Sequence, residues 1–348
     1  MSLSKEDANL KALAPIVIGC ADTALTADEK SLFADRPPAG LILFRRNCVS
    51  KNQVSDLVAS FRELVKWADA PVLIDQEGGS VARLKAPEWT EFPPAGDFAA
   101  QAEDDLEQAC DAVYQNAFAM ARELAEIGVT VNCAPVMDVP SPECHDFLSG
   151  SRTYGTDAHQ VTELAEHVCR GLLAAGVTPV MKHIPGHGRG TSDSHKELPK
   201  VTAELAALKE IDFAPFRTLS KSDLGNAVWA MGAHIVYTAL DADHAATISG
   251  KVMREAVRGS IGFTGVVIAD DIGMEALSGT LAERAVQTLQ AGCDLTLHCS
   301  GDFDEMRGIF AALPEISSLS LERMLRAEEL RHEFMADAGT QTERGMVG

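Results

Sequence analysis

Ionisable side chains follow five short apolar runs of the sequence, and each group could do chemistry. The groups are Asp75 with Arg83; Asp138 with Arg152; Lys182, His183 and His187 with Asp193 and His195; His234; and Asp270 with Asp271. To bury so many charges in one place would be costly unless a ligand satisfied them. The five groups together therefore predict one polar site that binds or converts a ligand.

Each of these residues taken singly has a structural alternative. An aspartate at a strand end, such as Asp75 or Asp270, often caps the helix that follows. A lone histidine is usually a core or loop residue, and single arginines are usually surface residues. The glycines at 186, 188 and 190 could shape a turn, and they lack the spacing of a phosphate-binding loop. The coincidence of five groups, and not any one residue, favours the functional interpretation.

Eight short runs are apolar on both faces, which is typical of buried parallel strands. They are Pro15–Cys20, Gly40–Phe44, Pro71–Asp75, Val129–Ala134, Thr178–Lys182, Ala227–His234, Gly265–Asp270 and Asp294–His298. All five ionisable groups come after the carboxyl ends of such runs. In an eight-stranded barrel these ends share one face, which is where barrel enzymes carry their active sites.

Helical patterns separate the strands. From residue 54 onward, Leu57, Val58, Phe61, Leu64 and Val65 form an apolar stripe, and helices are expected near 105–127, 161–172, 203–220, 251–258, 280–290, 303–312 and 319–336. Pro215 should kink or divide the 203–220 helix. The first strand is not followed by a Gly-x-Gly-x-x-Gly turn, which argues against a dinucleotide-binding sheet. We therefore expect one (β/α)8 catalytic barrel over residues 1–338 and a flexible polar tail over 339–348.

Composition narrows the class of protein. The 348 residues carry a net charge of -21, which argues against a nucleic-acid partner. Eight cysteines without CxxC spacing predict reduced thiols and no zinc ribbon. No secretory signal or membrane-spanning run is visible, so we expect a cytoplasmic protein without membrane contact, a monomer or weak oligomer.

The segment KHIPGHGRGTSDSHKELP at 182–199 resembles the signature of glycoside hydrolase family 3, in its single-domain bacterial β-N-acetylglucosaminidase branch. Supporting matches are LIDQEGGSVARL at 73–84, SGSRTYG at 149–155, AHIVYTALD at 233–241 and GVVIADDIGMEAL at 265–277. The chain departs from the family pattern at Ile184, where phenylalanine is usual, and at Gly232, where a larger residue is common. Neither departure removes a reactive group.

The resemblance implies a retaining exo-β-N-acetylglucosaminidase that needs no cofactor and no metal. Asp270 would be the nucleophile, and His195, oriented by Asp193, would donate and accept the proton. Asp75, Arg83, Arg152, Lys182 and His183 would bind the terminal sugar. Asp271 should point to the other side of its strand and be structural. The family also implies a cell-wall muropeptide substrate, GlcNAc-1,6-anhydro-MurNAc with or without peptide.

Three other functions remain open at this stage. A phosphorylase could use the same residues, because a neutral histidine donor tolerates an incoming phosphate. A metal-dependent barrel hydrolase could use His183, His187, His195, Asp193 and Asp270 as ligands, although Lys182 beside them argues against a cation. A sugar-binding barrel without activity would have no need of the acid–base residues.

Overall fold

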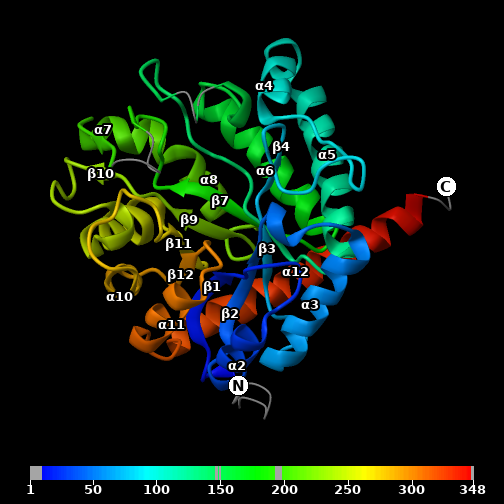
Figure 1. Ribbon diagram of the computed structural model, residues 1–348. Helices are drawn as coiled ribbons and strands as arrows, with labels where there is room; N and C mark the ends of the chain where they lie inside the picture. The colour runs from blue at the N-terminus through cyan, green and yellow to red at the C-terminus, as the bar shows by residue number, and fades with distance from the viewer. Residues whose placement is uncertain (1–9, 146–147, 149, 193–197, 346–348) are drawn as a thin grey trace.

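Eight parallel strands close into one barrel in the computed structural model, which describes residues 10–145, 148, 150–192 and 198–345 (Figure 1). Each strand pairs with the next barrel strand in chain order, and the last pairs with the first. The strands are β1 (Ala14–Gly19), β2 (Pro38–Leu43), β3 (Val72–Ile74), β6 (Val131–Asn132), β7 (Thr178–Ile184), β9 (Trp229–Gly232), β11 (Val267–Asp271) and β12 (Leu295–His298). This confirms the predicted (β/α)8 barrel. Each strand lies inside or within one residue of its expected range, apart from β2, which begins two residues earlier, and β7, which ends two residues later.

The helices surround the barrel and connect its strands. They are α2 (Ala27–Asp35), α3 (Lys51–Val65), α4 (Ala95–Asp104), α5 (Leu106–Glu126), α6 (Ala158–Ala174), α7 (Leu205–Ala207), α8 (Ala214–Lys221), α9 (Gly250–Val252), α10 (Leu281–Ala291), α11 (Phe303–Ala312) and α12 (Ser318–Gly345). Two π-helical segments, η3 (Leu208–Asp212) and η5 (Met253–Ile261), continue α7 and α9. Pro215 lies in the first turn of α8, so the 203–220 helix is divided there as expected.

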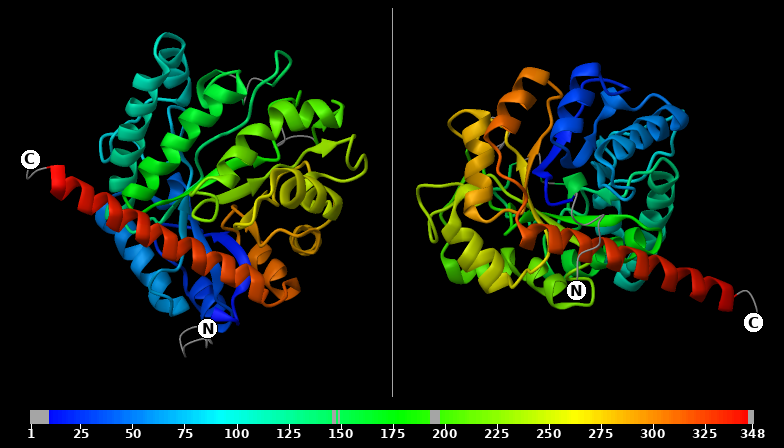
Figure 2. Two further views of the ribbon diagram at one scale, coloured as in Figure 1. Left: turned by 180° about the vertical axis from the view of Figure 1, so that it is seen from behind. Right: turned by 90° about the horizontal axis from the view of Figure 1, so that it is seen from below.

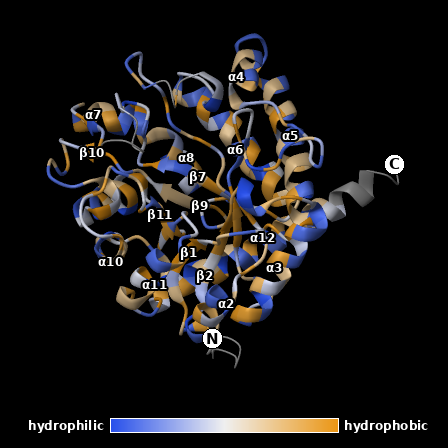
Figure 3. Cartoon of the chain, in the orientation of Figure 1, coloured by the Kyte–Doolittle hydropathy of each residue, from blue (hydrophilic) through white to orange (hydrophobic). Residues whose placement is uncertain are grey.

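The core consists of the strands and the helix faces turned toward them. The barrel strands are the most apolar part of the chain, and most of their residues are fully buried (Figure 3). In α3 four residues of the predicted stripe, Leu57, Val58, Phe61 and Val65, are buried, and the fifth, Leu64, is partly buried. Ser50 caps the helix by accepting from the Gln53 amide.

Two small sheets lie outside the barrel. In the first, β4 (Gln76–Gly78) pairs with β5 (Val81–Ala82) in an antiparallel hairpin directly after β3. In the second, β8 (Lys200–Val201) pairs with β10 (Val236–Tyr237) in parallel. The β4–β5 hairpin matters for function because it extends the edge of the barrel on which Asp75 lies.

The last helix is longer than the sequence predicted. The last helix, expected to end near 336, continues as α12 to Gly345, so residues 339–345 of the supposed flexible tail are helical. Glutamate, glutamine and arginine in this segment favour a helix, and one internal glycine costs only about 1 kcal/mol. Figure 2 shows α12 crossing one end of the barrel and extending past it.

Two helices, α2 and α4, were not among the predicted helical segments. Only Glu29 and Phe33 of α2 are buried, so this helix has no apolar stripe that could reveal it. Its start does carry a signal, because Thr26 and Glu29 form a reciprocal capping box. No helix in the described part of the chain is long and apolar enough to cross a bilayer.

Candidate active site

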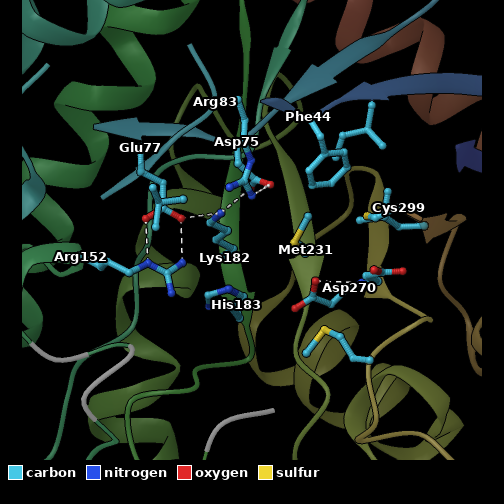
Figure 4. Close-up of a pocket in the computed structure, with 15 residues that line it drawn as sticks. Phe44, Asp75, Glu77, Arg83, Arg152, Lys182, His183, Met231, Asp270 and Cys299 are labelled. Carbon is cyan, nitrogen blue, oxygen red and sulfur yellow. Dashed lines mark hydrogen bonds and ion pairs between the residues drawn. The ribbon is translucent and has the colours of Figure 1, made fainter. Parts of the chain in front are cut away.

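A cavity of about 380 Å³ opens at the carboxyl ends of the barrel strands (Figure 4). Its ionisable lining residues are Asp75, Glu77, Arg83, Arg152, Lys182, His183, Asp270 and Asp271, and its other lining residues are Ile42, Phe44, Val81, Met231, Met274, Leu297 and Cys299. Asp270 and all five predicted sugar-binding residues therefore line one cavity. They come from β7, β11, η2 (Gly150–Arg152) and the segment after β3, and the barrel fold brings them together.

The predicted acid–base residues, Asp193 and His195, lie outside the described residues, so their pairing stays a prediction. The described part of this loop includes His187, which is buried beside the cavity-lining residue His183. The imidazole of His187 packs edge-on against that of His183, with ring centroids 5.7 Å apart. Burial lowers the pKa of His187 to about 4, so this ring is neutral at physiological pH.

The segment from Asp75 to Gly79 is shaped by strand geometry. Alternate residues of an extended chain share a face, so Asp75 and Glu77 both face the cavity while Gln76 points away. The Gln76 side chain accepts hydrogen bonds from the amides of Arg83 and Leu84, and its backbone exchanges two hydrogen bonds with the Asn132 side chain. This clamp fixes the hairpin to the barrel and so fixes both carboxylates.

A continuous chain of ion pairs runs along one wall of the cavity. Arg83 donates to Asp75 at 2.9 Å, and the Lys182 ammonium lies 3.0 Å from Asp75 and 2.7 Å from Glu77. Arg152 donates to both oxygens of Glu77, at 2.9 and 2.7 Å. Such charge-assisted contacts are strong and directional, and the bidentate pair adds geometric precision.

These neighbours keep every member of the chain charged. Burial alone would raise the pKa of both carboxyls, but Lys182 and the arginines hold the pKa values of Asp75 and Glu77 below their ordinary range. Burial alone would lower the pKa of Lys182, but Asp75 and Glu77 outweigh it and raise that pKa. Three cations and two carboxylates leave one excess positive charge on this wall, opposite the aspartates of β11.

His183 is oriented from behind by Asp138. Its Nδ1 lies 2.7 Å from the Asp138 carboxylate, which also accepts from the backbone amides of His183 and His187. Burial would raise the pKa of Asp138, but His183 and these hydrogen bonds hold it below its ordinary value. An ionised Asp138 accepts a hydrogen bond from the Nδ1–H of His183, so the Nε2 edge of His183 is the one available to a ligand.

Asp270 is the penultimate residue of β11 on the opposite wall, where its carboxylate faces the cavity (Figure 4). Neither Asp270 nor Asp75 caps a helix. The helix after β11 begins at Leu281 with Thr280 as its cap, and the segment after Asp75 is a strand. The structural alternative for both residues is therefore excluded.

The expectation for Asp271 was wrong in part. The pairing of β11 with β12 shifts register between Ile268 and Asp271, so simple alternation fails here, and Asp271 also lines the cavity. Its carboxylate accepts from the Gly273 amide and lies 3.6 Å from His298 Nδ1. These contacts agree with a supporting role for Asp271.

His234 does not line the cavity. Its ring is buried, and it contacts the Thr247 hydroxyl and the Asp271 carbonyl.

Sequence reasoning missed Glu77 as a site residue, although the segment around it was noted. The two-residue spacing from Asp75 was the available signal, because both side chains must share a face. The apolar lining residues Phe44, Met231 and Met274 were also missed. Phe44 and Met231 belong to apolar runs whose composition does not distinguish a cavity wall from core, and Met274 lies beyond the end of β11.

The proposed metal ligands of the rival hydrolase do not form a metal site in the described residues. The one described group of three side chains with suitable spacing is Asp69, Glu328 and His332, near the other end of the barrel. Lys182 beside His183 places a fixed positive charge in the cavity, which does not suit a bound cation.

Comparison with known proteins identifies the family of this chain. The family described as "Glycosyl hydrolase family 3 N terminal domain" matches residues 7–328. A β-hexosaminidase of Alkalilimnicola ehrlichii is 35% identical over 318 residues, which cover 90% of this chain and 88% of that protein.

Two solved structures have the same fold. NagZ of Neisseria gonorrhoeae in complex with N-trifluoroacetyl-D-glucosamine is 28% identical, with a TM-score of 0.82 and 97% of each chain covered. A family 3 β-N-acetylglucosaminidase of Paenibacillus sp. str. FPU-7 is 29% identical, also with a TM-score of 0.82; the match covers 95% of this chain and 63% of that one. From the family match and the curated relatives, the chain belongs to glycosyl hydrolase family 3.

Proposed function

We propose that this protein is a retaining exo-β-N-acetylglucosaminidase, which removes a terminal β-linked N-acetylglucosamine. One observation carries the proposal: Asp270 faces, across a single cavity, an ion-pair chain whose donors and acceptors suit sugar hydroxyls. The cavity volume lies in the range of small-ligand sites, roughly 300–1,000 Å³. The β-hexosaminidase relatives and the sugar complex of NagZ support this choice of substrate class.

The ion-pair wall would bind the sugar ring. Asp75 accepts from Arg83 and Lys182 and keeps lone pairs for two neighbouring hydroxyl groups. Lys182, Arg152 and the Nε2 edge of His183 would contact the remaining ring substituents. Because the protein's own ion pairs hold these groups in place, little side-chain entropy is lost when the sugar binds.

In the first chemical step, the Asp270 carboxylate attacks the anomeric carbon and the bond to the leaving oxygen breaks. His195, oriented by Asp193, gives its proton to that oxygen, and a covalent glycosyl-enzyme forms. In the second step, His195 takes a proton from water, which attacks the same carbon and releases Asp270. Two inversions at one carbon leave the sugar with its original β configuration.

The natural substrate within this class is proposed from the family resemblance alone. It is a cell-wall muropeptide, GlcNAc-1,6-anhydro-MurNAc with or without peptide. We place the reaction in the cytoplasm, where such fragments are recycled. All eight cysteines are free thiols, which is typical of a reducing compartment.

The test compares 4-nitrophenyl β-N-acetylglucosaminide with the matching β-glucoside. We expect the first to be cleaved at least about a hundredfold faster, since a site that pairs its buried polar groups with one substrate rejects analogues that leave them unpaired. Proton NMR of the first product should show the β anomer. Equal rates on the two substrates would contradict the proposed specificity, and an α product would contradict retention.

The same assay separates the rival activities. Addition of phosphate should leave free N-acetylglucosamine as the product, whereas a phosphorylase would form the sugar 1-phosphate. Dialysis against a chelator should leave the rate unchanged, whereas a metal-dependent hydrolase would lose activity.

A further inference from the structure

Glu77 is held more firmly than any other carboxylate of the cavity. Its side chain is 8% exposed, and it accepts three charge-assisted contacts: two from Arg152 and one from Lys182. A carboxylate has about four acceptor sites, so Glu77 has little capacity left for a ligand. Asp75, with one contact to Arg83 and one to Lys182, keeps more of its capacity.

The backbone of Glu77 is also fixed. The next residue, Gly78, has a φ of +99°, and a Cβ there would lie 2.3 Å from the Pro93 carbonyl oxygen. Only glycine fits this turn. Gln76 on the other side is clamped to Asn132 and to the Arg83 and Leu84 amides. Glu77 therefore presents its carboxylate at one place relative to β7.

The two cations that Glu77 contacts come from distant parts of the chain and repel each other. Lys182 belongs to β7, and Arg152 lies in η2 (Gly150–Arg152). Their side chains are 3% and 15% exposed, so water screens the repulsion only weakly. Two of the three Lys182 N–H groups point at Asp75 and Glu77, which leaves one donor for a ligand.

We propose that Glu77 is a positioning residue, which does not bind the sugar itself but holds the Lys182 ammonium and the Arg152 guanidinium together where they bind it. The inference rests on the proposed function, because it concerns the same site. It assigns Glu77 to ground-state binding of the sugar, through Lys182 and Arg152, and not to the bond-breaking step.

The negative charge of Glu77 also helps to keep Lys182 protonated, which an uncharged residue of the same shape would not do. The charged and titratable groups around Lys182 are Asp75 at the end of β3, Glu77 on β4, Arg152 on η2 and Cys133 after β6. Burial and Arg152 lower the pKa of Lys182, and the two carboxylates raise it. If Glu77 loses its charge, Lys182 keeps the burial and the repulsion from Arg152, so its pKa falls.

The experiment measures kcat and KM for 4-nitrophenyl β-N-acetylglucosaminide from pH 6 to pH 10 in the wild type, Glu77→Gln and Glu77→Asp. Glu77→Gln should raise KM by about tenfold or more at pH 7 and change kcat by less than about threefold, because lost ground-state binding acts on KM. It should also show a further rise of KM at alkaline pH, as Lys182 loses its proton. Glu77→Asp keeps the charge, so it should show a smaller rise of KM and no added alkaline dependence.

A matched control is Asp294→Asn, which removes another buried carboxylate at the start of β12, at the other end of the barrel. Asp294 is 3% exposed, pairs with Arg258 and Arg323, and does not line the cavity. This variant should lower the melting temperature but keep the wild-type KM and pH profile, so it separates loss of stability from loss of positioning.

The outcomes are distinct. Inactivity of the wild type on this substrate would refute the proposed function. An active wild type with unchanged KM in Glu77→Gln, or with a loss confined to kcat, would overturn the role of Glu77 alone. If Glu77→Gln does not fold, Glu77→Asp decides: an unchanged KM, or an alkaline rise of KM despite the retained charge, would also overturn it.

Discussion

The proposed reaction depends on the carboxylate of Asp270. It faces the cavity and caps no helix, so its removal should cost little folding stability. We expect Asp270→Ala to stay folded and to lose roughly three or more orders of magnitude in kcat, because no covalent intermediate can form. Kinetics with an aryl β-N-acetylglucosaminide and a thermal melt measure the two effects.

Two further measurements make this prediction specific. Added azide should restore part of the turnover of Asp270→Ala and form the α-glycosyl azide, because a small anion can attack from the space that the carboxylate leaves. A 2-deoxy-2-fluoro or 5-fluoro glycosyl donor should label the wild type at Asp270, as peptide mapping can show. A label on Asp271 or Asp75 would move the nucleophile to another residue.

Asp138 acts on the site through His183. Its carboxylate accepts from the His183 ring and from the backbone amides of His183 and His187, and its pKa is lowered, so it is ionised at neutral pH. Asp138→Asn turns an acceptor into a partial donor and leaves one of these groups unpaired. We expect a loss of about 1–3 kcal/mol in unfolding free energy and a raised KM.

A double-mutant cycle with His183→Ala tests whether the effect of Asp138 on KM passes through the ring. In the His183→Ala background, Asp138→Asn should change KM by much less than it does in the wild type, since residues in one hydrogen-bond network are not additive. Additive effects would show that Asp138 acts independently of His183.

At the scale of elements, α12 closes the amino-terminal end of the barrel. Met324, Glu328 and Arg331 of this helix line a small cavity together with residues at the starts of β3, β6, β7 and β9. Arg331 donates to the Gly176 carbonyl and lies 3.5 Å from Asp69, and His332 lies 3.6 Å from Asp69. The helix is thus attached through a group of charges that surround Glu328.

These contacts predict a pH dependence of stability. Burial, and then Asp69, raise the pKa of Glu328 to about 7, against the opposing effect of Arg331 and Arg62. The folded state therefore keeps a proton that the unfolded state loses above its pKa of about 4.3. The stability from this group is fully present below that pH and is lost as pH rises toward 7. Glu328 is partly exposed, so the effect is reduced by solvent screening.

The measurement compares melting temperatures of the wild type and Glu328→Gln from pH 5 to pH 8. The glutamine cannot ionise, so the melting temperature of the wild type should fall relative to that of the variant as pH rises. Other groups that titrate in this range affect both proteins alike and cancel in the difference. A difference that does not change with pH would refute the role of Glu328.

At the scale of the whole molecule, the net charge of -21 opposes compaction. An increase from about 10 mM to about 150 mM sodium chloride shortens the Debye length from roughly 30 Å to roughly 8 Å, which weakens repulsion between surface carboxylates. We expect a higher melting temperature in the higher salt, with chloride used in place of sulfate to limit general stabilisation. A melting temperature that stays constant or falls would show that local ion pairs outweigh the overall repulsion.

The order and type of the barrel elements could be determined from the sequence alone. Runs that are apolar on both faces mark buried parallel strands, and stripes such as Leu57, Val58 and Phe61 mark helices that pack on them. The family was also recognisable, because short segments such as 182–199 carry it. These features are local in the chain, so no contact between distant residues is needed to read them.

Only the tertiary structure decided which charges meet. Glu77 pairs with Arg152 across 75 residues, and Asp75 pairs with Lys182 across 107, because the fold brings these side chains to one wall of the cavity. The register shift that turns Asp271 toward the cavity likewise depends on the pairing of β11 with β12. Side-chain direction and long-range pairing arise from packing. They depend on the distances between residues far apart in the chain, which the sequence by itself does not give.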